Sequence, residues 1–383
     1  MRTRLWRLVA TSTALSIAVA ACGSEESASF ETIAAPDAET AGTLAAVCPD
    51  PVVIQTDWFP EAEYGATYGL IGDDYEVDVE RRLVRGSLVS NDEDTGIDVE
   101  VRTGGPAIGS QPVATQLYVD DEITLGFANT DAAAVYAADA PILGVVAPLE
   151  KNPQIIMWDP ETYPEVETIA DLGELGVTVN IFSSGVFSGV LASLGILSGD
   201  QIDPSYDGSP SRFIAEDGAI AQQGFASAEP YYYEFVFEEW MKPVAFELIH
   251  DAGFRQYSQT ISIRRDDLDA LRPCLELLVP IYQQSAVDYV EDPAATNALI
   301  IDTVARFDDF WVYDEGVAEY SATTQKELGL VGNGPDETLG NFDLDRVQEV
   351  IDQMANAGME IPEGLKAEDL VTNEFVDPSI GLP

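Results

Sequence analysis

The sequence predicts an α/β protein of two lobes, each built on a sheet in which parallel strands dominate. Short apolar strands alternate with helices along most of the chain, an order typical of a parallel sheet covered on both faces. Roughly 335 of the 383 residues remain once the N-terminal segments are set aside, more than one hydrophobic core usually accommodates. We therefore expect two lobes.

The first lobe is predicted from apolar runs that end at turn residues. Residues 97–101 alternate apolar and polar side chains, as a half-buried strand does. Residues 52–55 are a short apolar run, which is typical of a fully buried strand. Glycine and proline residues separate these runs from the helical stretches. The expected strands are 52–55, 97–101, 123–128, 142–147 and 154–158, and the expected helices are 61–71, 110–118 and 130–138.

The second lobe is expected to occupy residues 159–258. The pattern predicts a strand at 177–181, a helix at 186–197, a helix leading into a short strand over 218–225, and a strand at 245–249.

The chain is then expected to return to the first lobe. Residues 258–263 read as a strand, and helical patterns follow at 273–290, 293–313 and 344–357, the last capped by Asp343. The first lobe is thus expected to be discontinuous, comprising residues 48–158 and 259–383.

Two cysteines fit this return. Cys48 and Cys274 are an even pair in a chain that carries an export signal, so a disulfide between them is expected. It would tie the start of the fold to a late segment. The alternative is two unrelated buried thiols.

The N-terminus predicts export. Three arginines precede an apolar stretch over residues 8–21 that is too short to span a bilayer comfortably. Because small residues lead directly into Cys22, residues 1–21 resemble a bacterial lipoprotein signal, with Cys22 as the acylated first residue of the mature chain. Ordinary secretion with cleavage near Ala21 is the alternative. Residues 22–47 are acidic and poor in aromatics, so they are expected to form a disordered tether.

The charge balance excludes some partners. The chain has 68 acidic and 18 basic residues, a net charge of −50. Such a field repels nucleic acid and anionic lipid, so membrane contact is expected only through the lipid anchor. Solubility in a saline medium explains the acidity better than a specific cationic partner does.

An ordered set of short motifs resembles a known family. The segments VVIQTDWFP, GGP, GFANTDAA, NIFSSGVFSGVLASLGI and ASAEPYYYE occur in this order within residues 50–315. Together with Cys22 they resemble the type II solute-binding proteins of ABC importers, in particular the branch that binds the thiamine pyrimidine precursor, with sulfonate and nitrate binders as relatives. The resemblance implies a type II periplasmic-binding-protein fold with a two-segment hinge, placed near Trp158 and Ser258.

Candidate ligand residues follow the strands of the first lobe. Asp57, Trp58 and Phe59 come directly after the first strand, and ligands of parallel sheets bind at strand carboxyl ends. Trp58 offers a flat face for a planar ring or packs under its own helix; Asp57 accepts a proton from a ring amine or caps that helix. Asn129 and Thr130 end another strand, where Thr130 is equally suited to a plain capping role.

The second lobe offers a similar turn. Ser183, Ser184 and Gly185 lie between a strand and a helix, and in the family it resembles such a turn supplies hydrogen bonds to the ligand. Tyr64 and Phe187 are weaker ligand candidates.

Glu229 lies beside a run of three tyrosines, the most suggestive local cluster. A carboxylate next to aromatic rings suits an aminopyrimidine or another cationic or amine-bearing ring. In a strand the three tyrosines cannot all face one way, so either Tyr232 or its two neighbours would line a cleft. A tyrosine-rich surface against the hinge is the alternative.

Catalysis is not expected. His250 is the only histidine, which excludes a site built from several histidines, and its position at a strand end suits a structural role. The acidic run 91–96 lacks the spacing of a calcium loop. Arg102 and Arg212, possible anion ligands, lie in none of the candidate turns. No metal and no cofactor is therefore expected.

The sequence thus predicts a membrane-anchored, exported and monomeric receptor that closes two lobes around a small planar nutrient and delivers it to an ABC permease and its ATPase. A pyrimidine-type heterocycle is the favoured ligand. The alternatives are a sulfonate, nitrate or other small nutrient, and a lipoprotein scaffold without a ligand.

Overall fold

The structure is a computed structural model that describes residues 43–183, 185–309 and 311–383. The expected signal, Cys22 and most of the expected tether lie outside the described residues. The last tether residues are described and contradict the prediction, because Leu44–Val47 form helix α1 and Leu44 is buried in the main hydrophobic core.

The first sheet has seven strands in the order β2-β3-β4-β1-β5-β12-β6. Strand β1 pairs in parallel with β4 and β5, and β12 enters late in the chain to pair antiparallel with β5 and β6. All strands except β3 and β12 therefore point the same way. The bounds are β1 Val52–Gln55, β2 Glu76–Asp78, β3 Leu83–Ser90, β4 Glu93–Arg102, β5 Leu125–Ala128, β6 Ile142–Val146 and β12 Thr260–Arg264.

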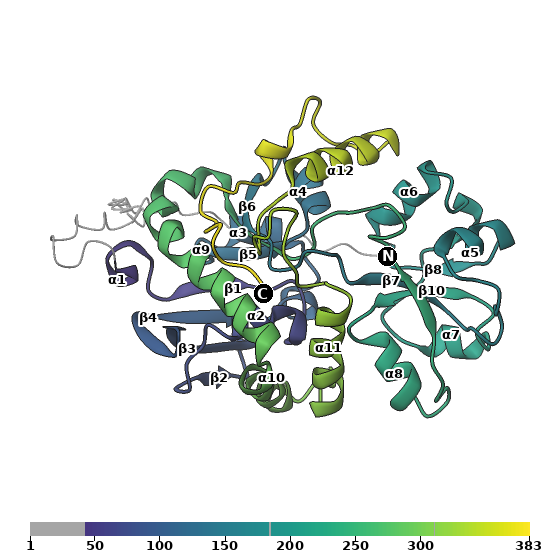
Figure 1. The fold of residues 1–383 in the computed structure, drawn as a ribbon, viewed down its shortest axis with the longest axis horizontal. Coiled ribbons are helices and arrows are strands. Elements are labelled where there is room, and N and C mark those ends of the chain that lie inside the picture. The colour runs from purple at the N-terminus through teal and green to yellow at the C-terminus, as the bar shows by residue number, and fades with distance from the viewer. Residues whose placement is uncertain (1–42, 184, 310) are drawn as a thin grey trace, which may run out of the picture. The chain divides into compact units, whose positions relative to one another are not determined.

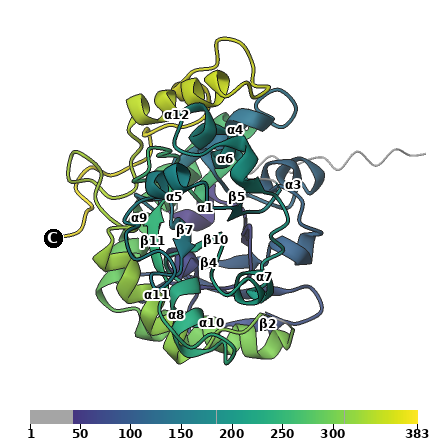
Figure 2. The same ribbon diagram turned by 90° about the vertical axis from the view of Figure 1, so that its right-hand side faces the viewer.

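The second sheet has five strands in the order β11-β7-β10-β8-β9, of which only β7 runs against the others. Figure 2 labels three of them, β11, β7 and β10. The bounds are β7 Gln154–Trp158, β8 Val179–Asn180, β9 Ile202–Asp203, β10 Ala221–Phe225 and β11 Ala245–Leu248. The expected boundary at residue 158 assigned β7 to the first lobe, whereas its backbone pairs with β10 and β11. The segments that link the two sheets are therefore 147–153 and 249–259, which we call the crossing segments.

Helices cover both sheets (Figure 1). With the first sheet lie η1 Ala62–Tyr64, α2 Gly65–Tyr68, η2 Gly105–Ile108, α3 Val113–Val119, α4 Thr130–Tyr136, η4 Arg265–Asp267, α9 Leu268–Glu291, α10 Ala294–Phe307, α11 Glu315–Glu327, α12 Leu344–Asn356 and η5 Ala367–Asp369. With the second lie α5 Ile169–Leu175, α6 Val186–Ser193, η3 Gly199–Gln201, α7 Ser211–Ala215 and α8 Glu229–Phe235.

Two predicted elements of the second lobe are wrong. Residues 218–225, expected to be a helix leading into a short strand, contain the strand β10 without the helix; β10 lies between β7 and β8, and Gly218 ends the preceding turn at φ +70°. The tyrosine run that follows is helical. Pro230 supplies the fixed φ suited to the first turn of α8. Burial in the sheet therefore explains the strand β10, and the proline at the helix start explains the helix α8.

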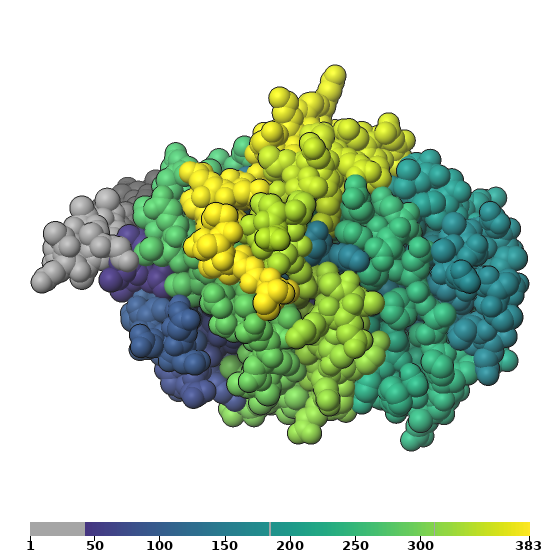
Figure 3. Space-filling model, viewed as in Figure 1, coloured from purple at the N-terminus to yellow at the C-terminus, as the bar shows by residue number. Residues whose placement is uncertain are grey.

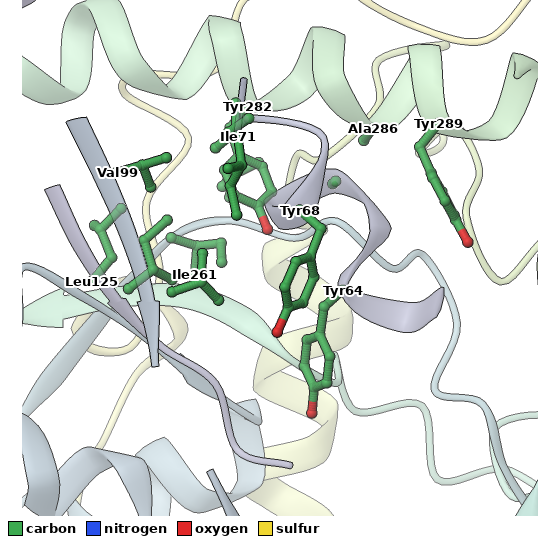
Figure 4. Close-up of a cluster of buried hydrophobic side chains, with 14 of the residues drawn as sticks. Tyr64, Tyr68, Ile71, Val99, Leu125, Ile261, Tyr282, Ala286 and Tyr289 are labelled. Atoms are coloured by element: carbon green, nitrogen blue, oxygen red, sulfur yellow. The ribbon is translucent and has the colours of Figure 1, made fainter. Parts of the chain in front are cut away.

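Helix α9 lies over the main core and carries the predicted disulfide. Cys274 on α9 is bonded to Cys48, which confirms the pairing. Below the helix, tyrosine rings from α9 and the η1–α2 turn pack against apolar side chains of the sheet (Figure 4). The C-terminal segment lies across α9 (Figure 3), where Gln283 and Asp377 exchange hydrogen bonds of 2.8 and 3.2 Å.

Helix α12 contacts both lobes. The side chain of Asp343 accepts hydrogen bonds from the backbone N–H groups of Asp345 and Arg346, which confirms the predicted cap. The helix packs on α4 of the first lobe and α6 of the second, and its buried face joins a cluster with members from both.

Candidate functional site

A cavity of about 190 Å³ lies where the strands of the two sheets end. The turns after β1, β5 and β8 and the end of the second crossing segment contribute to its wall, so the carboxyl ends of parallel strands meet there. The lining residues are Asp57, Trp58, Glu61, Asn129, Gln154, Phe182, Tyr206, Gly208, Gln223, Phe225, Ala228, Glu229, Ser258, Gln259 and Trp311.

Aromatic rings form one part of the wall. Trp58 meets Trp311 edge to face, with ring centroids 6.0 Å apart. Phe59 lies behind them, buried and stacked on Trp311 at 5.8 Å, so it supports the wall without lining the cavity. From the second lobe, Phe182 and Tyr206 add a tilted pair at 4.6 Å. These faces are suited to a planar or cationic ligand.

Carboxyl groups form the other part. Asp57 accepts a 2.7 Å hydrogen bond from the Tyr64 hydroxyl, and burial raises the pKa of Asp57 to about 6. Glu229 accepts from the backbone N–H of Phe225 at 2.6 Å, and burial raises the pKa of Glu229 to about 7.

Glu61 provides the third carboxyl group, and its ionised form is the least stabilised of the three. Burial, and then repulsion from Glu63, Asp57 and Glu229, holds the pKa of Glu61 well above its usual range. Glu63, behind the cavity wall, is hydrogen-bonded to Ser227, and burial also raises its pKa. None of the described residues that line the cavity is a lysine, arginine or histidine. The site is therefore acidic and lacks an internal counter-charge.

Amide side chains complete the polar surface. The Oδ1 atom of Asn129 accepts from the backbone N–H of Gln259 at 2.8 Å and so ties a strand end to the second crossing segment. Gln259 has a left-handed backbone, φ +53°, a conformation that costs energy in a residue other than glycine. Its Oε1 atom is buried and has no hydrogen-bond partner in the described part of the chain. A buried acceptor of this kind is a place for a ligand N–H group.

The structure brings four predicted residues to the cavity: Asp57, Trp58, Asn129 and Glu229. Sequence reasoning missed Glu61, Phe182, Tyr206, Gln259 and Trp311. Glu61 was visible only as a helix start, and Trp311 lies within what was expected to be one long helix. In the structure α10 ends at Phe307, and the indole Nε1–H of Trp311 donates to the Pro60 carbonyl at 3.2 Å.

Other predicted residues lie elsewhere. Thr130 is buried and exchanges hydrogen bonds with the backbone of Tyr257, so it holds the second crossing segment. Tyr64 is buried behind Asp57, and Phe187 is buried in the hydrophobic cluster that has members from both lobes. Ser183 is exposed and Gly185 precedes α6, both outside the cavity lining, and Ser184 lies outside the described residues.

A larger cavity of about 680 Å³ adjoins the first. Apolar and aromatic side chains on α8 and directly after it, together with Val312 before α11, provide much of its additional lining. The rest is Pro106, Ser110, Asp207, Ser209 and Pro210. Tyr232 lines this cavity, and its hydroxyl donates to the Val312 carbonyl at 2.7 Å. The lining shared by both cavities comprises Trp58, Phe182, Tyr206, Gly208, Glu229 and Trp311.

Basic side chains are engaged away from the site. Arg102 pairs with Glu100, Asp120 and Glu122 at 2.6–2.9 Å, and Arg212 pairs with Asp203. Burial and the nearby Arg346 lower the pKa of His250 to about 3, so this ring is neutral. Within the described ranges no group of His, Cys, Asp and Glu is arranged to hold a metal ion, and no helix has the length and apolar character to cross a membrane.

Solved structures share this fold. The ligand-binding component of an ABC-type import system from Staphylococcus aureus, with zinc bound, gives a TM-score of 0.52 at 12% identity, covering 85% of this chain and 99% of that one. The alkanesulfonate-binding protein SsuA from Xanthomonas axonopodis pv. citri, bound to MOPS, gives 0.51 at 14% identity, covering 85% and 99%. The periplasmic nitrate-binding protein NrtA from Synechocystis PCC 6803 gives 0.50 at 11% identity, covering 85% and 88%.

These neighbours are solute-binding components of transport systems, and they confirm the predicted α/β fold of the periplasmic-binding-protein type. No protein-family model matches the sequence, and no curated protein matches it either. At such low identities the likeness does not extend to the ligand.

Proposed function

We propose that this protein is the substrate-binding component of an ABC importer and that it captures a small, planar, amine-bearing heterocycle of the thiamine-pyrimidine-precursor type. The fold shared with solute-binding proteins supports the transport role. The observation that carries the ligand class is the acidic cavity between aromatic rings, where the described lining residues offer three carboxyl groups and no basic side chain.

The charge of the cavity argues against anions. Sulfonate and nitrate need guanidinium groups or converging helix N-termini, whereas a bound anion here would meet Asp57, Glu61 and Glu229. Each of these carboxyl groups repels an anion when it is ionised, and in a partly desolvated site this repulsion exceeds its value in water. The sulfonate and nitrate alternative is therefore the weaker one for this chain.

In this proposal the lobes close about the two crossing segments, and a permease with its ATPase recognises the closed state. The protein acts as a monomer, and Cys22, once acylated, holds it at the membrane face.

A thermal-shift screen tests the proposal. Hydroxymethyl-aminopyrimidine at 100 times its dissociation constant stabilises the protein by about 2.7 kcal/mol, and alkanesulfonates and nitrate give no shift. Trp58→Ala abolishes the shift, whereas Phe235→Ala, which removes an exposed ring outside both cavities, preserves it. A shift with anions alone would overturn the heterocycle, and no shift with any nutrient would favour a scaffold.

A further inference from the structure

The two adjoining cavities differ in size and in chemistry. The inner cavity, about 190 Å³, is smaller than the roughly 300–1,000 Å³ of pockets that enclose drug-sized ligands, whereas the outer one, about 680 Å³, falls within that range. They share Trp58, Trp311 and Glu229 in their walls, so the two cavities meet at these residues.

The inner end is built from acceptors. Asp57, Glu61 and Glu229 present carboxyl groups, and the buried Oε1 atom of Gln259 has no partner among the described residues. The carboxyl groups have no basic partner among the described lining residues, and the Gln259 oxygen has no donor there, so a group that carries both positive charge and several N–H bonds satisfies them together. An ammonium or amidinium group has these properties.

The outer end is built from apolar surface on both lobes. Val236, directly after α8, and Val312, on the loop before α11, are 40% and 61% exposed and line this cavity from the two lobes. The Tyr232 hydroxyl bonded to the Val312 carbonyl joins the two sides. Asp207 and the shared Glu229 are the charged residues in this lining.

We infer that the ligand is an elongated organic cation, with an amine or amidine head in the inner cavity and an apolar body in the outer one. This inference rests on the proposed binding function and extends it from a single ring to a longer molecule. The head is recognised by charge and hydrogen bonds, and the body by burial between the valines and the aromatic rings.

Calorimetry on the full chain with a matched series tests the inference. 4-Phenylbutylamine has three more methylene groups than benzylamine, and each buried methylene adds about fourfold to affinity, so we expect it to bind at least tenfold more tightly. The neutral 4-phenylbutanol binds at least tenfold more weakly than 4-phenylbutylamine, and 4-phenylbutyrate does not bind.

Variants at exposed positions keep the fold intact. Val236→Ser combined with Val312→Ser removes the advantage of the long amine over benzylamine, whereas Val119→Ser, at an exposed valine on α3 outside both cavities, leaves that advantage unchanged. Glu229→Gln weakens both amines.

Two outcomes separate the two proposals. Equal affinity for long and short amines, or binding of hydroxymethyl-aminopyrimidine without binding of either amine, overturns the elongated ligand and leaves the proposed function standing. If neither the amines nor the aminopyrimidine bind, the proposed heterocycle receptor fails, and the elongated ligand fails with it.

Discussion

Asp57 and Glu229 are the residues at which ligand charge and protonation meet. Burial raises their pKa values to about 6 and about 7, so each carries a proton part of the time near neutral pH in the empty site. A cation stabilises the ionised forms and therefore displaces protons when it binds.

Affinity for a cation is therefore expected to fall as the pH is lowered from 8 to 5. An alkylamine remains charged over this range, so the change in affinity with pH reports the ionisation of the protein's carboxyl groups. Isothermal titration at several pH values measures it, and at pH 7 the binding enthalpy varies with the ionisation enthalpy of the buffer. Glu229→Gln removes the part of the dependence centred near pH 7. Affinity that does not change with pH would contradict this account.

The same burial costs stability in the empty protein. The pKa of Glu229 rises from 4.5 to about 7 on folding, so its ionised form is disfavoured in the folded state. The penalty is absent below the unfolded value and is complete above the folded value, where it reaches up to about 3 kcal/mol.

Glu229→Gln is accordingly expected to raise the melting temperature at pH 8 and to give little gain at pH 4.5. Thermal unfolding without ligand at the two pH values measures the difference. Glu239→Gln, at an exposed position, serves as the control and changes neither value appreciably. If the gain in melting temperature from Glu229→Gln instead grew toward acid pH, ionised Glu229 would be stabilising the folded protein, which would contradict this account.

At the scale of elements, Arg346 on α12 joins the two crossing segments. Its guanidinium group pairs with Glu150 of the first at 2.9 Å, donates to the carbonyls of Arg255 and Gln256 of the second, and lies 3.7 Å from the ring centroid of Tyr257. Only 4% of its side chain is exposed. The helix cap at Asp343 fixes the start of α12 and thereby the position of this arginine.

Arg346→Met is expected to lower the free energy of unfolding by about 3 kcal/mol, because it leaves Glu150 and the carbonyls of Arg255 and Gln256 without their partner. Chemical denaturation measures the loss. Arg255→Met is the control, since its ion pair with Glu349 is nearly half exposed on both sides and contributes at most about 1 kcal/mol. Equal losses in the two variants would show that the buried position of Arg346 does not matter.

Elements also show where prediction from sequence succeeded. Apolar runs such as 52–55 and 142–147 gave strands because burial and β-propensity agree there, and Asp343 marked a helix start through a local hydrogen bond. Residues 218–225 and the tyrosine run were misread because their state depends on neighbours in the sheet and on a proline at a helix start. The strands β2 and β3 were not predicted at all.

Prediction of the candidate site from sequence also succeeded for some residues and failed for others. Asp57, Trp58, Asn129 and Glu229 could be named because they follow strands or stand beside aromatic residues. Glu61, Tyr206, Gln259 and Trp311 could not be named, because loops without periodicity bring them to the cavity.

For the whole molecule, the excess of acidic residues dominates the electrostatics. A net charge of −50 favours expansion of the folded chain through self-repulsion. Salt screens these interactions over about 10 Å at 0.1 M and over about 3 Å at 1 M.

The melting temperature at pH 8 is therefore expected to rise as sodium chloride increases from 0.1 to 1 M. Differential scanning calorimetry measures it, with uncharged sucrose at matched osmolality as the control for solvent effects. A melting temperature that falls with salt would mean that attractive ion pairs outweigh the repulsion.

The sequence by itself determined the fold class, the pairing of Cys48 with Cys274, and the strand ends from which a site could be built, because each depends on local pattern or on composition. Only the tertiary structure decided that β7 belongs to the second sheet, that α12 joins both lobes, and that acidic groups converge in a cavity whose described lining has no basic side chain. These features depend on residues far apart in the chain, whose proximity is set by packing.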